Sequence, residues 1–154
     1  MAKCIECGKW GAFLKVTKEG LCHSCEIERI LAENRDFHIS RCYHANLPNN
    51  YVFFLGLDDR FKRFAICVQP INERFRLAFF NYHDLLDFRM EKSETTLNRC
   101  NTLMMSIYLN SLVNPQMTFY FVNTPVQIGS DTYNYAVQSA NDVYGFLTYI
   151  RHNT

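Results

Sequence analysis

SDTYNYAVQSANDVYGFLTYIRHN, residues 130–153, is the last segment of the chain and has the periodicity of a helix. Its apolar residues recur about every 3.6 positions, and Ser130 or Asp131 can cap its start. The recurring residues are Tyr133, Ala136, Val137, Ala140, Val143, Leu147 and Ile150. Gly145 weakens the pattern by roughly 1 kcal/mol relative to alanine. The segment therefore predicts one amphipathic helix that closes the chain.

Seven strand-length runs come before this helix, and each is alternating or continuously apolar. The runs are 36–44, 50–59, 61–69, 75–82, 84–92, 101–109 and 117–124. Turn-forming residues separate them, including Pro48-Asn49-Asn50, Asp58-Asp59-Arg60 and Asn114-Pro115. The aromatic content of 15% also favours sheet, because aromatic side chains suit a pleated surface. We expect a bent, mostly antiparallel sheet with one C-terminal helix over its open end, which is a pleckstrin-homology-like arrangement.

The overall composition argues against several classes of protein. Charged residues make up 20% of the chain and the formal net charge is +1, so strong electrostatic attraction to phosphate or anionic lipid is not expected. No stretch approaches the ~20 apolar residues that cross a membrane, and the first residues, Met-Ala-Lys-Cys, lack the apolar run of a secretory signal. The sequence therefore predicts a cytoplasmic protein without a transmembrane segment, whose seven cysteines are reduced or bound to metal.

Four of these cysteines form two Cys-x-x-Cys pairs near the N-terminus, Cys4 with Cys7 and Cys22 with Cys25. Gly8 follows the first pair, and a turn that brings both sulfurs to one ion needs a residue for which a positive φ costs little. The fourteen residues between the pairs lie just below the usual spacing of paired-cysteine zinc sites. Four thiolates complete a tetrahedral Zn²⁺ shell and leave no position for water, so the pattern predicts one structural zinc ion.

A short helix is expected after the second pair, because Ile27, Ile30 and Leu31 have helical spacing. A cysteine turn, a hairpin over residues 10–21 and a ligand pair at a helix start are the plan of a treble-clef or zinc-ribbon module. We place this module at residues 1–35 and a pleckstrin-homology-like domain at residues 36–154. Disulfides or a redox dithiol are the alternative use of the four thiols, although the sequence lacks the βαβ context of a thioredoxin-like pair. His23, within the second pair, is interpreted as a surface residue.

The larger domain also resembles a known group of proteins. Tyr82–Leu86 is a Tyr-x-Asp-Leu-Leu strand start, Glu91 and Glu94 form an acidic strand end, and Asn110–Pro115 is an Asn-x-Leu-x-Asn-Pro turn. Together with the two cysteine pairs, these features resemble small bacterial and phage proteins that join a Cys4 zinc-ribbon module to a bacterial pleckstrin-homology-like domain. The resemblance covers nearly the whole chain and departs at Ser93-Glu94-Thr95, where the group has a glycine. It implies an α+β, mostly β fold and no catalytic residues.

Other cysteines and histidines have simple interpretations. His38, Cys42 and His44 alternate on a predicted strand and share a face, but a second metal site is not expected there because no further ligand cluster is visible. Cys67 and Cys100 lie in apolar runs, and we expect both to be buried and to behave as small hydrophobes.

The sequence also offers no grouping typical of an active site. His83 and Asp84 are neighbours on a predicted strand, where adjacent side chains point to opposite faces, so we do not expect them to cooperate. The sequence contains no glycine-rich phosphate loop, nucleophile elbow or His-Glu-x-x-His motif. The expectation is a protein that is not an enzyme.

Basic residues cluster at one predicted hairpin tip, which contains Arg60, Lys62 and Arg63. A basic loop between early strands can bind phosphoinositide in eukaryotic pleckstrin-homology domains. Here Asp58 and Asp59 nearly cancel the three bases, so a solvated turn is the simpler interpretation. The zinc module likewise balances six basic residues against five acidic ones within residues 1–35 and lacks the basic surface of a nucleic-acid binder.

These patterns together predict a non-enzymatic zinc-binding protein with an interaction or regulatory role. We expect the larger domain to bind a protein or peptide partner at the open edge of its sheet, beside the helix. The alternative is a nucleic-acid-associated regulator that uses the zinc module. A strongly salt-dependent affinity for nucleic acid would separate the two, because phosphate contacts release counterions.

The first prediction concerns the metal. We expect purified protein to carry one Zn²⁺ per chain, bound by Cys4, Cys7, Cys22 and Cys25, as measured by elemental analysis. Combining Cys4→Ser with Cys25→Ser should abolish zinc binding, because two thiolates do not close the shell, whereas Cys42→Ser should keep the metal. A chelator should loosen the 1–35 module and leave the β-rich circular dichroism signal in place. Zinc-free wild-type protein, or zinc retained by the double variant, would contradict the assignment.

Overall fold

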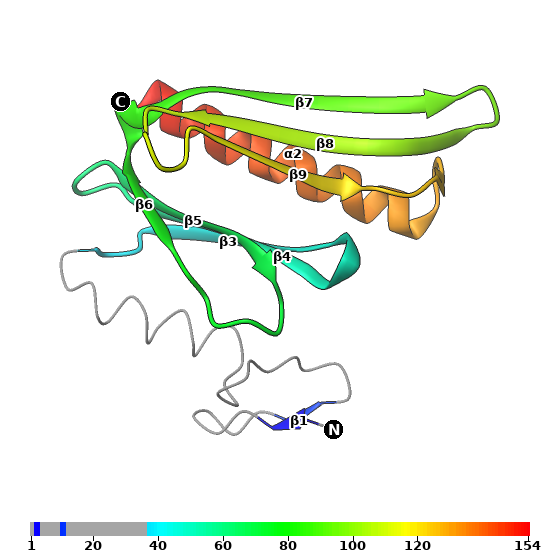
Figure 1. The fold of residues 1–154 in the computed structure, drawn as a ribbon, viewed down its shortest axis with the longest axis horizontal. Coiled ribbons are helices and arrows are strands. Elements are labelled where there is room, and N and C mark those ends of the chain that lie inside the picture. Colours follow the sequence, from blue (N-terminus) through cyan, green and yellow to red (C-terminus); the bar gives the residue numbers. More distant parts are fainter. Residues whose placement is uncertain (1, 4–9, 12–36) are drawn as a thin grey trace. The chain divides into compact units, whose positions relative to one another are not determined.

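The computed structural model describes residues 2–3, 10–11 and 37–154, and the chain divides into two compact units. The first unit contains the described residues up to His44 together with Asn50–Phe79, and the second contains Ala45–Asn49 together with Phe80–Thr154. Both are built mainly of antiparallel strands, and a long helix ends the second unit (Figure 1). The prediction of an α+β, mostly β fold with a C-terminal helix is therefore confirmed.

A short strand pair is the described part of the N-terminal region. β1, Ala2–Lys3, pairs antiparallel with β2, Trp10–Gly11, so that Ala2 lies opposite Gly11 and Lys3 lies opposite Trp10. The four cysteines of the predicted zinc site and the helix expected after them lie outside the described residues. The zinc module at residues 1–35 and its boundary with the next domain therefore stay predictions.

A four-stranded sheet has the order β3-β4-β5-β6, and its two central strands belong to the first unit. Its strands are β3 Arg41–Leu47, β4 Tyr51–Asp58, β5 Arg63–Pro70 and β6 Ala78–Asn81. β4 and β5 pair along their whole length, from Tyr51 opposite Pro70 to Asp58 opposite Arg63. Seven of the eight residues of β4 and five of the eight residues of β5 are buried, which accounts for the near-continuous apolar runs in their sequences. The 3₁₀ turn η1, Pro48–Asn50, joins β3 to β4.

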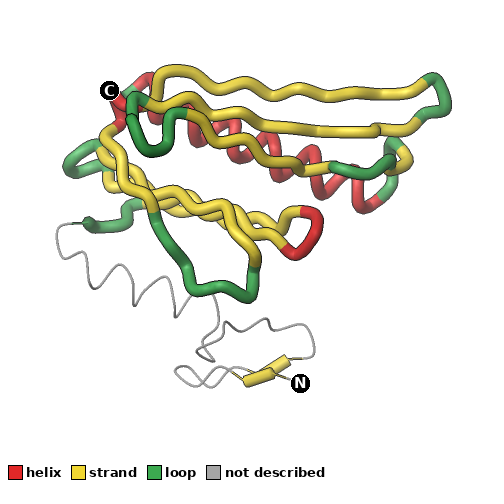
Figure 2. The backbone as a smooth tube through the Cα atoms, viewed as in Figure 1, coloured by secondary structure: helices red, strands yellow, loops and turns green. Residues whose placement is uncertain are grey.

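The second unit contains another antiparallel sheet, in which β8 is the central strand. Its strands are β7 Leu85–Thr95, β8 Arg99–Leu109, β9 Gln116–Val122 and the short β10 Val126–Gln127. β7 pairs with one side of β8, while β9 and β10 pair with the other side. The 3₁₀ turn η2, Tyr82–Asp84, leads into β7. Figure 2 shows the long β7–β8 hairpin and the loop that closes it.

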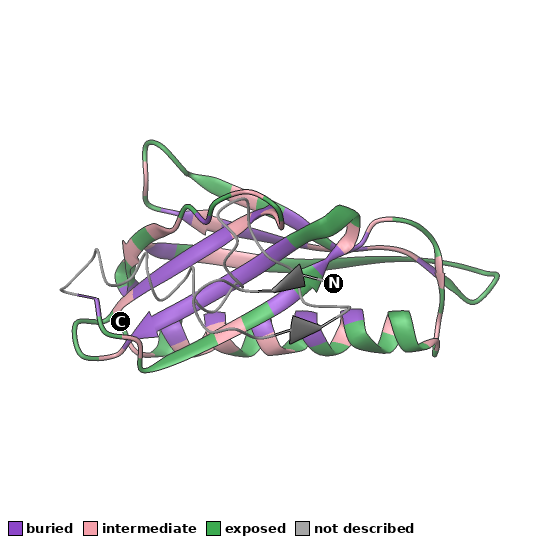
Figure 3. Cartoon of the chain, turned by 90° about the horizontal axis from the view of Figure 1, so that it is seen from below, coloured by how far each residue is buried: buried purple, intermediate pink, exposed green. Residues whose placement is uncertain are grey.

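Helix α2, Asp131–His152, lies along one face of this sheet and contacts β7, β8 and β9 (Figure 1). Its buried residues alternate with exposed ones at helical spacing (Figure 3). The buried residues are Ala136, Ser139, Ala140, Val143, Leu147 and Ile150. The Ser130 hydroxyl accepts a hydrogen bond from the Tyr133 N–H at 3.2 Å and caps the helix start. The predicted helix, its apolar stripe and its cap are therefore confirmed.

The strands predicted from the sequence are present from β3 to β9, with differences at their ends. β3 begins at Arg41, so His38 precedes the strand instead of lying on it. β7 continues to Thr95, and the hairpin turns at residues 96–98 without the glycine of the resembled group. Asn98 adopts a φ of 59° there, and asparagine tolerates this left-handed conformation better than most residues. The sequence does not predict β10, because two residues are too few to show an alternation.

The helix offers a test of its own stability. Gly145 lies on the exposed side of α2, and a Cβ placed there would meet no atom within 4 Å. Gly145→Ala should raise the free energy of unfolding by about 0.5–1 kcal/mol, because alanine loses less backbone entropy in a helix. Urea unfolding measures the change. Gly129→Ala is the control and should destabilise, because Gly129 has a φ of 87°. A Gly145→Ala protein less stable than wild type would count against the observed helix.

Candidate functional site

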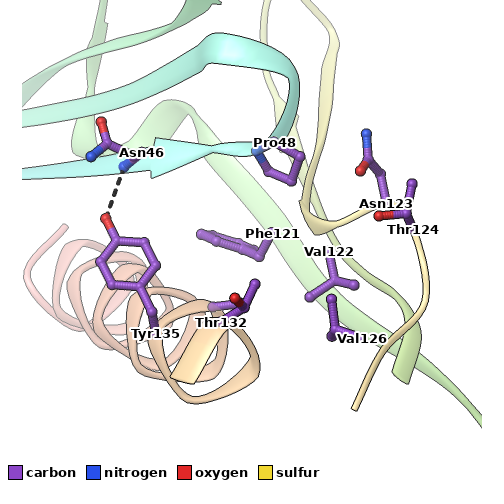
Figure 4. Close-up of a pocket in the computed structure, with 10 residues that line it drawn as sticks. Asn46, Pro48, Phe121, Val122, Asn123, Thr124, Val126, Thr132 and Tyr135 are labelled. Carbon is purple, nitrogen blue, oxygen red and sulfur yellow. Dashed lines mark hydrogen bonds between the residues drawn. The ribbon is translucent and has the colours of Figure 1, made fainter. Parts of the chain in front are cut away.

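An open cavity of about 220 Å³ lies in the second unit, beside the N-terminal half of α2 (Figure 4). Three parts of the chain form it: the end of β9 with the loop to β10, the first turns of α2, and the segment from Asn46 to Pro48. β9 supplies Phe121 and Val122, and the helix supplies Tyr135 and Ala136. The cavity therefore depends on segments that are about 75 to 90 residues apart in the sequence.

The inner wall of the cavity is apolar. Phe121, Val122 and Ala136 are buried, and Val126 is partly buried. The Phe121 ring packs edge-on against Phe119, with 5.5 Å between the ring centroids, because both side chains lie on the same face of β9. A rigid aromatic wall of this kind favours an apolar group in the cavity.

The rim of the cavity is polar. The Asn46 backbone N–H donates a hydrogen bond to the Tyr135 hydroxyl oxygen at 3.1 Å, which ties α2 to the segment before Pro48 (Figure 4). The Tyr135 side chain remains half exposed at 51%. A phenolic oxygen that accepts one hydrogen bond can still donate its own proton. Asn123, Thr124 and Thr132 add further donors and acceptors around the opening.

The chemistry of this lining favours binding. None of the ten residues that line the cavity carries a carboxylate, imidazole, amine, guanidinium or thiol group. The cavity therefore has no side chain that can act as a general acid or base near neutral pH. Its volume is below the roughly 300–1,000 Å³ of pockets that hold drug-sized ligands. A single apolar side chain with polar backbone on either side matches its size and lining.

Reasoning from the sequence did not identify this cavity. Its residues are ordinary members of a strand, a loop and a helix, and they carry no motif. The signal that could have pointed to it is weak: small and polar residues at Asn123, Thr124 and Thr132 interrupt apolar segments near the ends of two elements. The spatial meeting of these segments is what creates the site.

The predicted basic cluster lies at the β4–β5 hairpin, where it surrounds a buried carboxylate. Asp58 is fully buried and accepts hydrogen bonds from the His38 N–H at 3.1 Å, the Arg60 N–H at 3.1 Å and Arg63 Nη2 at 3.0 Å. Asp59 forms an ion pair with Arg41 at 3.4 Å. Of the three predicted bases, Arg63 is offset by Asp58, whereas Asp59 pairs with Arg41 outside the cluster; the full burial of Asp58 also differs from the solvated turn that the sequence predicts.

Burial and hydrogen bonding act in opposite directions on the pKa of Asp58. Burial raises the pKa of this carboxyl group, but hydrogen bonds from the His38 backbone, the Arg63 side chain and the Phe61 backbone lower it, and the net pKa is below the ordinary value of 3.8. Asp58 is therefore ionised in the folded protein at neutral pH. It anchors the segment before β3 and the guanidinium of Arg63 to the end of β4.

The described cysteines and histidines outside the predicted zinc site lie apart from one another or are buried. Cys67 and Cys100 are buried as predicted, and burial raises the pKa of the Cys100 thiol. Cys42 is exposed, and the His44 ring packs edge-on against Phe54 with centroids 5.0 Å apart. Over residues 2–3, 10–11 and 37–154, no group of three side chains is arranged to hold a metal ion. Cys4, Cys7, Cys22 and Cys25 lie outside these ranges.

The prediction that His83 and Asp84 are neighbours on a strand is wrong. The two residues belong to the 3₁₀ turn η2, not to a strand, so their side chains are not forced to opposite faces. His83 Nε2 lies 3.6 Å from Asp84 Oδ1. The Asp84 carboxylate also accepts the Asn81 N–H at 3.0 Å, as part of a capping box. The His83 side chain is 72% exposed, so the pair lies on an open turn outside the cavity lining.

Comparisons of the chain with protein-family models, with curated proteins and with solved structures found no match. Within the portion of the chain that the structure describes, no helix combines the length and the apolar character needed to cross a membrane.

The Asp58 contacts predict a pH dependence of stability. Because the pKa of Asp58 is lower in the folded than in the unfolded protein, its ionised form stabilises the fold above about pH 4, and this contribution is lost as the pH falls through the lowered value. Asp58→Asn should cost about 2–4 kcal/mol at pH 7, because Arg63 loses its charged partner. Urea unfolding at pH 7 and pH 3 should show that the difference from wild type shrinks at the lower pH.

Asp59, the partly exposed neighbour of Asp58, provides the control. Asp59→Asn removes a surface ion pair and should cost no more than about 1 kcal/mol at either pH. Equal losses for the two substitutions, or an Asp58→Asn effect that does not change between pH 7 and pH 3, would contradict the role assigned to Asp58.

Proposed function

We propose that this chain is a non-enzymatic, zinc-binding interaction or regulatory protein of the cytoplasm. In this proposal, Cys4, Cys7, Cys22 and Cys25 hold one structural Zn²⁺ in an N-terminal zinc-ribbon module, and residues 36–154 form a pleckstrin-homology-like domain that binds a protein or peptide partner. The order of strands from β3 to β9, followed by α2, supports the domain assignment. The resemblance to small bacterial and phage proteins of this architecture supports the zinc module.

The observation that carries the binding role is the apolar cavity with a polar rim in the second unit. Its inner residues, including Phe121 and Ala136, favour an aliphatic or aromatic side chain. The rim residues Asn123, Thr132 and Tyr135 can hydrogen-bond to peptide groups on either side of that side chain. This combination suits an anchor residue within an extended segment of a partner protein, where one buried side chain contributes much of the affinity.

Defined peptides test this role with the full-length protein. In ¹⁵N-labelled protein, acetyl-Gly-Leu-Gly-amide and acetyl-Gly-Phe-Gly-amide should shift the amide signals of Phe121–Thr124 and of Thr132–Ala136. Acetyl-Gly-Gly-Gly-amide should leave them unchanged, because it brings no apolar side chain. Short peptides of this kind are expected to bind weakly, with a Kd on the order of 1 mM.

A pair of helix variants assigns the binding to the cavity. Thr132→Trp places an indole at the cavity opening and should weaken peptide binding at least about tenfold. Gln138→Trp makes the same change at an exposed position of α2 outside the lining and should leave binding unchanged. Peptide binding that is equal in both variants, or no binding by the wild-type protein, would overturn the cavity as the binding site. Tight, strongly salt-dependent binding of a single-stranded oligonucleotide would favour the nucleic-acid alternative.

A further inference from the structure

β7 is an edge strand with an unusual arrangement of charges. Among the strands that the structure describes, it pairs only with β8. Shifts in register interrupt this pairing between Leu85 and Asp87 and between Ser93 and Glu94. The segment between the shifts, Asp87–Ser93, pairs without interruption with β8 and has Met90 at its centre. A regular edge of seven residues is long enough to pair with another strand.

Strand geometry limits how two copies of this edge can pair. Along an antiparallel strand, alternate residues direct their N–H and C=O groups to the same side. The residues of β7 whose backbone groups face away from β8 are therefore all even-numbered or all odd-numbered within the regular segment. Pairing of two β7 strands places such residues opposite one another, so the two-fold axis passes through a residue and not between two residues.

The charges then select one axis. An axis at Arg89, Glu91 or Lys92 places each of these residues opposite its own copy, so like charges meet. An axis at Phe88 avoids this but draws the irregular region around Leu85 into the pairing. These four positions are therefore disfavoured by charge or by backbone geometry.

An axis at Met90 is free of both problems. It places Arg89 opposite Glu91 of the second copy, and Glu91 opposite Arg89 of the second copy, so that two opposite-charge pairs flank the axis. Phe88 then lies opposite the second copy's Lys92, and Met90 lies opposite itself. No like charges meet, and the pairing spans the whole regular segment.

The side chains are placed suitably for this arrangement. Phe88 and Lys92 point to the face of the sheet covered by α2, since Phe88 packs edge-on against Tyr144 at 4.9 Å and Lys92 Nζ lies 3.2 Å from the Tyr133 hydroxyl. Arg89 and Glu91 therefore point to the opposite face. The Arg89 side chain is 65% exposed; it forms a surface ion pair with Asp87 at 3.5 Å, and its guanidinium lies 5.9 Å from the centroid of the Tyr108 ring. A partner carboxylate can replace the surface ion pair. Glu91 is exposed as well.

Edge charges usually prevent strand pairing. They do so when a charge must be buried against an apolar strand or against a like charge. In β7 the signs alternate so that the strand is complementary to its own antiparallel copy in one register. The pattern therefore selects a register instead of blocking all of them.

We propose that two copies of this chain associate through antiparallel pairing of their β7 strands about a two-fold axis at Met90. The three main strands of each second unit then continue into those of the other copy, in the order β9-β8-β7-β7-β8-β9. This association uses the edge of β7 and does not depend on the partner that the cavity binds.

Charge reversal tests the interface and its register with the full chain. Sedimentation equilibrium at concentrations up to about 1 mM should show a dimer of the wild-type protein. Arg89→Glu alone or Glu91→Arg alone converts two attractive pairs into two repulsive ones and should weaken the dimer at least about tenfold. The double variant Arg89→Glu/Glu91→Arg should restore the dimer, because the pairs are attractive again with the signs exchanged.

Mixing the two single variants provides the decisive measurement. In a heterodimer of the Arg89→Glu chain with the Glu91→Arg chain, both cross-strand pairs are attractive, so the mixture should dimerise where each variant alone does not. Dimerisation on mixing also shows that both variants are folded. The control reverses the exposed pair Glu73 and Arg76, joined at 3.4 Å in the first unit, and should leave the dimer unchanged. A monomeric wild-type protein, or single variants that dimerise like wild type, would overturn the proposal.

Discussion

The second unit depends on the packing of the apolar side of α2 against its sheet. A sheet of three main strands needs one covered face to be stable, and a helix of 22 residues gains most of its stability from packing in its protein. Three residues of the helix provide this cover and are fully buried: Val143, Leu147 and Ile150. The cavity follows from the same contact, because small Ala136 is the buried residue nearest the helix start, where β9 ends and the chain turns toward β10. The helix therefore both holds the sheet and forms one wall of the binding site.

The sequence predicted the parts of the fold that depend on local periodicity. The helix and its Ser130 cap were predictable because a 3.6-residue repeat and a polar N-terminal residue report directly on helical structure. β4 and β5 were predictable because buried strands are almost continuously apolar. The ends of strands were less predictable, since β3 begins three residues beyond His38 and β7 continues through Thr95. A strand ends where its partner ends, and the partner is set by distant residues.

The candidate site was not predictable for the same reason. Tyr135 and Asn46 are joined by a hydrogen bond across 89 positions of sequence, and neither belongs to a motif. At His83 and Asp84 the local sequence pattern predicts a strand, but the structure has a 3₁₀ turn that the Asn81–Asp84 capping box stabilises. The turn changes which side chains can contact one another. A site that depends on the spacing of residues in the sequence, such as the cysteine pairs, can be proposed from the sequence alone. A cavity cannot, because its lining depends on how separate elements are positioned in space.

The two surfaces proposed for the second unit lie on opposite sides of β8. The cavity adjoins β9, and the pairing edge belongs to β7, so one strand separates them and neither blocks the other. A dimer joined at β7 therefore presents two cavities in a fixed symmetric relation. A partner that carries two anchor segments with a linker of suitable length could engage both, and the second contact would form at an effective concentration set by that linker, which can raise the overall affinity by about 10²–10⁴-fold. A cavity that binds one side chain weakly can in this way serve a specific interaction, because the geometry of the sheet supplies the selectivity that a single small cavity lacks.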